Sequence, residues 1–338
     1  MDNFENSIKW LLSGEGWIRY NTIVHLLDLD PSHPQALAAY KSMTQDKKIQ
    51  SLLDDIQEWE STVLKRHNDA NHPIHKLSFL AEIGFPGNDP KILQCLGLIF
   101  KHISSEGPFQ TLSNYPTHFG GSGKDEWLWV LCDTPLIVYC LIKFGLKQDP
   151  RVCHAYTHLI STVRKNGWPC TATIDLGKFR GPGKASAPCP YANLLMLKAA
   201  AAMKDTRNTD AVEAGIDTLL WLWENSYSAH PFLFKMGKNF QKLKVPFIWY
   251  DILHVLDVLS QFPYARQKKT YSQMVKIIRN KENKNFRYKS ESVWMKWKGW
   301  EFCQKREPSR WVTFAILRIL KRSGLINLNY LEKDVLLA

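Results

Sequence analysis

Several features that would assign a protein class at once are missing from these 338 residues. There is no uninterrupted apolar run of about 18 residues, the length that a membrane-spanning helix needs. The closest segment, 127–142, contains Asp133 and Pro135. The first residues lack the basic and then apolar pattern of a secretory signal peptide. These absences predict a cytoplasmic protein without a transmembrane segment.

No cysteine motif is present either. The seven cysteines are an odd number, follow no regular spacing and include no Cys-x-x-Cys pair. This usage suits a reducing compartment better than a disulfide framework. Cys132, Asp133, Cys170 and Cys189 carry atoms that zinc accepts as ligands, but buried free thiols are the simpler interpretation. The sequence therefore predicts no metal site, leaves a metal at these cysteines open and names no cofactor.

Positive charge is abundant, with a formal net charge of +12. Residues 266–306 interleave lysine and arginine with aromatic residues, namely Phe286, Tyr288, Trp294, Trp297 and Trp300. This combination suits single-stranded nucleic acid or another anionic surface. We favour the alternative that the aromatic side chains seal the interior while the lysines face water. A nucleic-acid partner is therefore not the favoured hypothesis, and the oligomeric state is not predicted.

Apolar residues at helical spacing recur in pairs of helices along the chain. In the segment 248–259 they define a wide apolar face, at Ile248, Ile252, Val255, Leu256 and Leu259. A more polar helix follows at 271–279, and an aromatic loop then closes the unit. The same order recurs in 134–163 and 190–224. Strand signals are weak throughout, so we predict an all-α protein.

Repeated helix pairs of this length cannot bury their apolar faces alone and must stack on one another. The first helix of each pair is the more apolar one. The repeats therefore predict a solenoid or a closed ring, with apolar helices inside and amphipathic helices outside.

This pattern resembles the terpenoid cyclase and protein prenyltransferase superfamily, whose fold is an α/α toroid. The chain is similar, more closely, to prokaryotic squalene-cyclase-like toroid proteins of unsettled activity. The matching pieces share aromatic, proline and basic residues, and they are 179–184, 188–192, 245–253, 294–300 and 308–313. The resemblance covers about residues 71–322. It implies a toroid domain at 71–338 and an N-terminal helical segment at 1–70 that packs on the ring or completes it.

The catalytic motifs of that superfamily are absent. Squalene cyclases use an Asp-x-Asp-Asp acid, and the nearest string here is Leu27–Pro31, in the wrong part of the chain. Protein prenyltransferases hold zinc with Asp-x-Cys and a later histidine. Glu301-Phe302-Cys303 imitates the first pair, but the last histidine is His254. Neither chemistry is carried over, and whether the chain is an enzyme stays open.

In a toroid the inner helices start at the same end, so the residues that open them gather around the central cavity. The candidate catalytic residues are Asp133, Asp251 and His254, because an Asp–His pair at i, i+3 suits general acid–base chemistry. Helix N-termini favour anions. The candidate ligand-binding residues open the inner helices or lie in a glycine-rich basic loop: His75, Tyr191, Trp249, Tyr250, Arg310 and Trp311, with Arg180 and Lys184 as an anion clamp.

The resulting functional hypothesis is an aromatic-lined cavity that binds or transforms an apolar, isoprenoid-like ligand with an anionic head. Two alternatives remain open. One is a non-catalytic helical-repeat scaffold whose cavity is filled by its own side chains. In that case Asp133 and Asp251 cap their helices and His254 is a core residue. The other is a nucleic-acid or anionic-surface binder that acts through residues 266–306.

Overall fold

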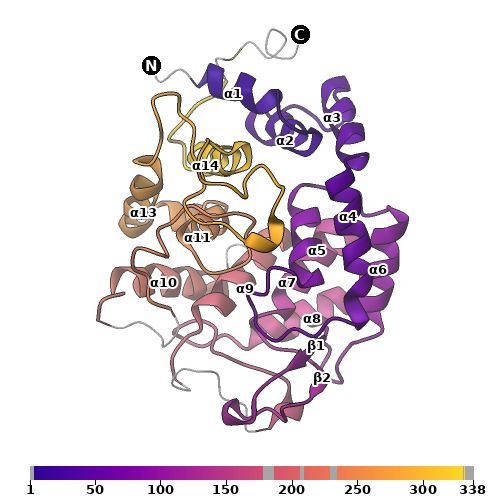
Figure 1. Ribbon diagram of the computed structural model, residues 1–338. Coiled ribbons are helices and arrows are strands. Elements are labelled where there is room, and N and C mark those ends of the chain that lie inside the picture. Colours follow the sequence, from indigo (N-terminus) through magenta and orange to yellow (C-terminus); the bar gives the residue numbers. More distant parts are fainter. Residues whose placement is uncertain (1–3, 178–185, 206–208, 229–233, 330, 332–338) are drawn as a thin grey trace.

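The computed structural model describes residues 4–177, 186–205, 209–228, 234–329 and 331. Helices dominate this part of the chain (Figure 1), which confirms the predicted all-α class at that level. The helices, in chain order, are α1 (Glu5–Leu12), α2 (Gly16–Asn21), η1 (Thr22–Leu26), α3 (Pro34–Thr44), α4 (Lys47–Asp55), η2 (Ile56–Glu60), α5 (Pro73–Glu82), α6 (Pro90–Phe100), η3 (Thr117–Phe119), α7 (Thr134–Leu141), η4 (Ile142–Leu146), α8 (Pro150–Ser161), η5 (Ile174–Leu176), α9 (Pro190–Met203), α10 (Asp210–Glu224), α11 (Ile252–Leu259), α12 (Pro263–Arg266), α13 (Lys269–Arg279), η6 (Met295–Trp297) and α14 (Arg310–Arg322).

Local sequence explains where many of these helices begin. The Asp89 carboxylate accepts hydrogen bonds from the backbone N–H groups of Lys91 and Ile92 at the start of α6. Asp149 accepts one from Arg151 at the start of α8. In both helices proline occupies the next position, where its missing N–H costs nothing. An acceptor followed by proline therefore sets the first turn before any tertiary contact forms.

The apolar helices lie inside and the amphipathic ones outside. Every residue of α7 and of α11 is buried, whereas α8 buries only the face formed by Val152, Ala155, Tyr156 and Leu159. The buried helices contact one another in succession, α5 with α7, α7 with α9, α9 with α11 and α11 with α14. The outer helices α8, α10 and α13 pack on α7, α9 and α11 respectively. From α7 to α13, helices buried on all sides therefore alternate with helices buried on one face.

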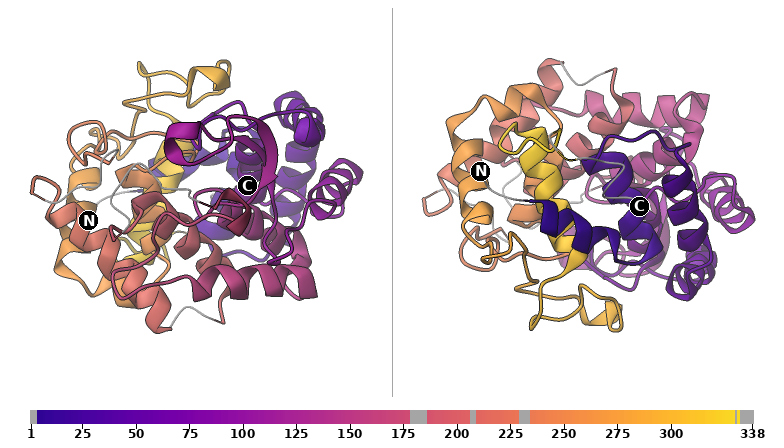
Figure 2. Two further views of the ribbon diagram at one scale, coloured as in Figure 1. Left: turned by 90° about the horizontal axis from the view of Figure 1, so that it is seen from below. Right: turned by 90° about the horizontal axis from the view of Figure 1, so that it is seen from above.

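The N-terminal helices contact both ends of this series. Seen from above, α1 and α2 lie beside α14 (Figure 2), in agreement with their contacts. The Trp17 ring of α2 lies 5.5 Å from the Phe79 ring of α5. The amide of Asn21 donates to the Ile83 carbonyl at 2.8 Å. Residues before position 70 therefore join the first and the last inner helix.

A short hairpin was not expected from the sequence. Strands β1 (Thr111–Asn114) and β2 (Asp125–Leu128) pair antiparallel, with Thr111 opposite Leu128. The Leu64 N–H donates to the Leu112 carbonyl at 2.8 Å, so a third segment joins β1 on its other side. The strands are too short to show an alternating pattern, and their pairing depends on residues far apart in the sequence.

One predicted helix boundary is wrong. The start predicted near residue 248 lies instead at Ile252, because the Asp251 carboxylate accepts from the N–H groups of Leu253 and His254 and caps the helix there.

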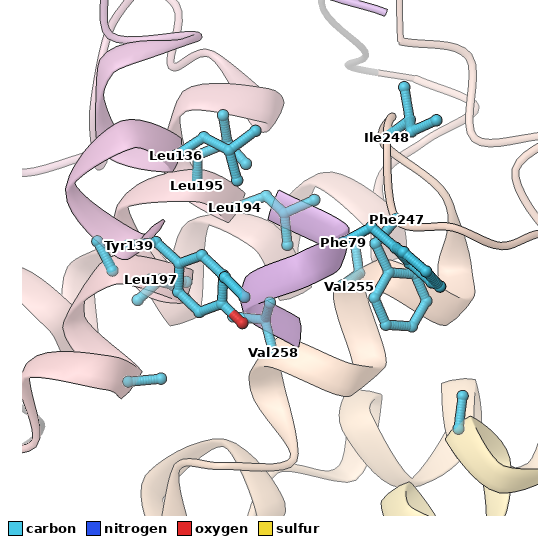
Figure 3. Close-up of a cluster of buried hydrophobic side chains, with 14 of the residues drawn as sticks. Phe79, Leu136, Tyr139, Leu194, Leu195, Leu197, Phe247, Ile248, Val255 and Val258 are labelled. Carbon is cyan, nitrogen blue, oxygen red and sulfur yellow. The ribbon is translucent and has the colours of Figure 1, made fainter. Parts of the chain in front are cut away.

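Apolar side chains cluster between the inner helices. Figure 3 shows side chains from α5, α7, α9 and α11, together with Phe247 and Ile248 of the preceding loop, gathered between the helices. Among the described residues, no helix is both long enough and apolar enough to cross a bilayer.

Candidate functional site

Three cysteines from separate parts of the chain meet at the starts of α7 and α9. The Sγ atoms of Cys132, Cys170 and Cys189 all lie within 4.8 Å of one another. Cys132 and Cys189 are 3.4 Å apart, and all three are free thiols. Sulfur ligands in this number are the donor set that zinc favours. The spacing along the chain gave no sign of this cluster, because its members come together only in the folded protein.

Backbone hydrogen bonds bring the three thiols together. The loop that carries Cys170 lies between two other segments. On one side the Leu131 N–H donates to the Thr171 carbonyl at 2.8 Å. On the other side the Cys189 N–H donates to the Trp168 carbonyl at 2.8 Å. The loop that carries Cys170 is therefore held between Leu131 and Cys189, the residue that caps α9.

The Asn193 amide, one turn into α9, strengthens this arrangement. Its oxygen accepts from the Trp168 N–H at 3.0 Å, and its nitrogen donates to the carbonyls of Trp168 and Cys189. Gly167 lies directly beneath, with φ of +84°. A Cβ at that position would come within 2.4 Å of the Asn193 amide oxygen, so glycine is required there.

Of the three thiols, Cys189 is the one whose pKa is lowered. Hydrogen bonds from Cys132 and Cys170 lower its pKa well below the usual value, although burial opposes them. Cys189 caps the N-terminus of α9, where the Ala192 N–H lies 3.5 Å from its sulfur. Helix N-termini stabilise thiolates. Hydrogen bonds with Cys170 and Cys189, together with burial, raise the pKa of Cys132 well above its usual value.

A histidine–carboxylate pair lies beside the thiols. The His67 Nδ1 is 2.9 Å and 3.0 Å from the two Asp133 carboxylate oxygens, and the Tyr115 hydroxyl donates to the same carboxylate at 3.4 Å. Burial lowers the pKa of His67, but the charge and hydrogen bond of Asp133 outweigh it and raise the pKa above its usual value. The positive charge of His67 also lowers the pKa of Cys189.

The unexpected hairpin explains why His67 reaches this place. Leu64 pairs with β1, and β2 runs directly into the residues before Cys132. Tyr115 follows the end of β1. No motif in the sequence marks His67 or Tyr115, so neither was a candidate. Their position depends on the pairing of segments about 50 residues apart along the chain.

Of the predicted catalytic residues, Asp133 belongs to this cluster and makes no side-chain cap on α7. Asp251 instead caps α11, and burial raises its pKa to about 7. His254 donates from Nδ1 to the Trp249 carbonyl at 2.9 Å, and burial lowers its pKa well below the usual value. The Asp251 carboxylate thus binds the backbone N–H of His254, while the ring nitrogen is engaged elsewhere.

Several predicted ligand-binding residues do gather near the thiols. The Tyr191 hydroxyl donates to the Ile248 carbonyl at 2.8 Å, and its ring lies 4.5 Å from that of Trp249. Burial and then the charge of Asp133 raise the pKa of Tyr191 well above its usual value. The Tyr250 hydroxyl lies 3.6 Å from the Met236 sulfur. The residues that open α9 therefore contact the residues that precede α11.

The buried histidines of α5 support the same end of the molecule. His75 donates from Nε2 to the His67 carbonyl at 2.8 Å, which fixes the backbone of His67. Burial lowers the pKa of His75 to about 3. The neighbouring His72 caps α5 by accepting from the Ile74 N–H at 3.2 Å. Both rings are therefore neutral structural groups, and His67 is the histidine whose pKa is raised.

The residues at the start of α14 contact α1, α2 and α5. Arg310 donates from Nε to the Trp10 carbonyl at 3.0 Å, and its guanidinium lies 4.7 Å from the Trp10 ring. Trp311 is fully buried against Trp17 and Phe79. The predicted ligand-binding residues Arg180 and Lys184 lie outside the described residues.

Two of the five aromatic residues named in the basic segment face inward, and Phe286, Trp294 and Trp300 are partly exposed. Tyr288 and Trp297 are buried, and the Trp297 indole donates to the Ala70 carbonyl at 3.0 Å. Lys296 and Lys298, on either side of Trp297, are exposed. This is the sealed arrangement that the sequence analysis favoured, and it leaves these two rings unable to stack on bases.

The chain matches no known protein family and none of the curated proteins. Among solved structures it is similar to the crystal structure of a protein from Actinoplanes, with a TM-score of 0.39 and 12% identity, over 91% of this chain and 90% of that chain. A similarity of this size carries no argument about fold or function.

Proposed function

We propose that the chain is an α/α toroid that binds one zinc ion through Cys132, Cys170 and Cys189. The unbroken series of contacts from α5 to α14, with α2 in contact with both of these helices, supports the toroid. The mutual approach of the three sulfur atoms within 4.8 Å carries the zinc proposal. Tetrahedral zinc with sulfur at about 2.3 Å places its sulfur ligands about 3.8 Å apart, so small side-chain movements complete the geometry.

Three protein ligands are the number found in catalytic zinc sites, where water or substrate takes the fourth position. A zinc ion there acidifies a bound water or thiol. His67 is oriented by Asp133, and because its pKa is raised it would serve as a proton donor or as a positive charge near Cys189. The free state of the seven thiols also supports a reducing, cytoplasmic location.

The apolar, isoprenoid-like ligand remains part of this proposal. Its support is the apolar interior of α7, α9 and α11, which adjoins the thiols at the helix starts. A non-catalytic scaffold with a structural zinc ion is the competing function. Measuring the coordination number of the metal separates the two, because a scaffold needs a closed, four-ligand site.

Metal content is the first test. Protein purified under reducing conditions with zinc in the growth medium is expected to contain about one zinc per chain by plasma mass spectrometry. Cys132→Ser, Cys170→Ser and Cys189→Ser are each expected to lose most of it. Cys303→Ser is the control, because Cys303 lies outside the cluster. Wild-type protein without zinc, or equal loss in the control, would contradict the proposal.

Oxidation is the alternative for the same thiols, since Cys132 and Cys189 approach to 3.4 Å. A disulfide would lower the mass of the protein by two hydrogens, and reduction with dithiothreitol would restore the original mass. If the reduced protein binds no zinc and the oxidised protein contains this disulfide, the site is a redox pair.

A further inference from the structure

A second polar cluster is buried where the later parts of α5, α9, α11 and α14 meet. It contains Glu82, Lys198, Asp257 and Arg318, which are 7%, 4%, 6% and 5% exposed. Arg318 donates to the Asp257 carboxylate from Nε at 3.1 Å and from a terminal nitrogen at 2.7 Å. Its contact with Glu82 is longer, at 3.6 Å. Charged groups this deeply buried need partners, because desolvation costs several kcal/mol per ion.

Lys198 lacks such a partner. Among the described residues no group accepts a hydrogen bond from its ammonium, and the Oε1 of Glu82 also lacks a hydrogen-bond partner. The Lys198 nitrogen instead lies over two aromatic rings, 4.8 Å from the centre of Tyr139 and 5.7 Å from the centre of Phe247. No hydrogen bond joins Lys198 to Glu82, although the charge of Lys198 acts on the Glu82 carboxyl.

The neighbouring His254 belongs to the same interior. Its ring stacks on Phe247 at 5.0 Å, and the charge of Lys198 helps burial to lower its pKa. The His254 Nε2 has no hydrogen-bond partner among the described residues. Unpaired polar atoms from α5, α9 and α11 thus mark one polar region in an otherwise apolar interior.

The charge balance indicates what this region accepts. Arg322 donates to the Asp257 carboxylate at 3.1 Å, so the buried and partly buried groups are three cations and two carboxylates. One positive charge is left over, and the group without an acceptor is Lys198. A single negative charge neutralises it, whereas a diphosphate would bring too many.

The surroundings indicate the rest of the ligand. Tyr139 and Phe247 flank Lys198, and Leu194 and Val258 belong to the same buried cluster (Figure 3). We propose that Lys198 binds the carboxylate of a small apolar acid inside the ring of inner helices. This site is separate from the thiol cluster, and it assigns the anionic head of the ligand to Lys198 rather than to Arg310.

The test compares octanoate with octanol, which share an alkyl chain and differ in charge. Isothermal titration of the EDTA-treated protein is expected to show saturable binding of about one octanoate per chain. The affinity for octanol is expected to be at least about tenfold lower, because octanol cannot form the charge-assisted hydrogen bond. EDTA removes the thiol-bound metal from the result, so failure of the zinc proposal would not alter it.

The lysine is tested with Lys198→Met and Lys198→Gln, which remove the charge but keep most of the side-chain length. Both are expected to bind octanoate at least about tenfold more weakly. Lys276→Met, on the exposed face of α13, makes the same charge change and is expected to bind as the wild type does. Circular dichroism checks the fold of each variant.

The proposal would be overturned if octanoate did not saturate the protein, or if it bound the lysine variants as tightly as the wild type. Either result would assign the region to buried water. If both Lys198 variants fail to fold, the octanoate and octanol titrations of the wild type decide the matter alone.

Discussion

The indole of Trp17 packs edge-on against the indole of Trp311, with ring centroids 4.9 Å apart and planes at 64°. Trp17 belongs to α2 and Trp311 to α14, so this contact joins the N-terminal helices to the last inner helix. Both rings are almost completely buried. The N-terminal segment is therefore part of the core that the other inner helices form.

Replacing Trp17 by alanine tests this relationship. Removing a buried tryptophan costs about 3–5 kcal/mol of unfolding free energy, through lost burial and the cavity that remains. Urea unfolding followed by circular dichroism measures it. The control is Trp221→Ala, because Trp221 is 50% exposed and its loss is expected to cost less than about 1 kcal/mol. Equal effects of the two substitutions would show that Trp17 does not join the helices.

The role of His67 is tested by His67→Ala. Because three cysteines hold the metal in our proposal, this variant is expected to retain about one zinc per chain. In cobalt-substituted protein, an added small thiol is expected to shift the visible spectrum by occupying the fourth position. Loss of the metal from His67→Ala, with a spectrum insensitive to added thiol, would indicate instead a closed site with His67 as the fourth ligand.

The Arg318–Asp257 ion pair is expected to stabilise the fold strongly once both charges are buried. Arg318→Met leaves Arg322 as the one remaining ion-pair partner of Asp257 among the described residues. This substitution is expected to lower the free energy of unfolding by about 3–5 kcal/mol. The double variant Arg318→Met/Asp257→Asn is expected to lose less than the sum of the two single variants. Urea unfolding of all four proteins gives the coupling energy.

An exposed pair serves as the comparison. Lys9 and Glu5 lie 2.7 Å apart on α1, with side chains 49% and 39% exposed, so Lys9→Met is expected to cost less than about 1 kcal/mol. Additive effects at Arg318 and Asp257 would mean that the buried pair contributes no more than this surface pair.

Asp251 makes stability depend on pH. Burial raises its pKa in the folded protein to about 7, whereas the unfolded value is about 3.9. Between these values the unfolded chain has lost this proton and the folded protein keeps it, so stability falls as pH rises through the window. Asp251→Asn preserves the cap without this charge and is expected to be more stable than wild type above pH 7, by up to about 4 kcal/mol.

Unfolding free energies of wild type and Asp251→Asn, measured from pH 4 to pH 8, check this expectation. The difference between the two proteins isolates Asp251 from other groups, such as Glu301, whose pKa burial also raises to about 7. A difference that stays constant with pH would show that Asp251 does not titrate in this range.

Gly167 is expected to tolerate no side chain. A Cβ there would come within 2.4 Å of Asn193 and 2.6 Å of Thr218, and the residue also has positive φ. Gly324 has positive φ as well, but no atom of the described residues lies within 4 Å of a Cβ built there, so Gly324→Ala measures backbone strain alone, about 1–2 kcal/mol. Gly167→Ala is expected to lower the melting temperature further and to weaken zinc binding, because it disturbs the loop before Cys170.

Local chemistry determined most of the helices of this protein. The segment 190–224 was predicted to hold a helix pair, and it contains α9 and α10. An aspartate followed by proline begins both α6 and α8, at Asp89 and Asp149. These signals act within one turn of helix, so they can be read without any knowledge of the fold. The start of α11 was missed because the capping side chain of Asp251 overrides the apolar pattern before it.

Tertiary structure alone decided the site. Cys132 and Cys189 are 57 positions apart, and His67 and Asp133 are 66 positions apart. Their meeting depends on β1, β2 and the loop around Cys170, which form hydrogen bonds between distant segments. The same is true of Lys198, whose place in the middle of α9 predicts burial but cannot reveal that its ammonium lacks an acceptor. Sequence records which groups are available, and long-range packing determines which of them face one another.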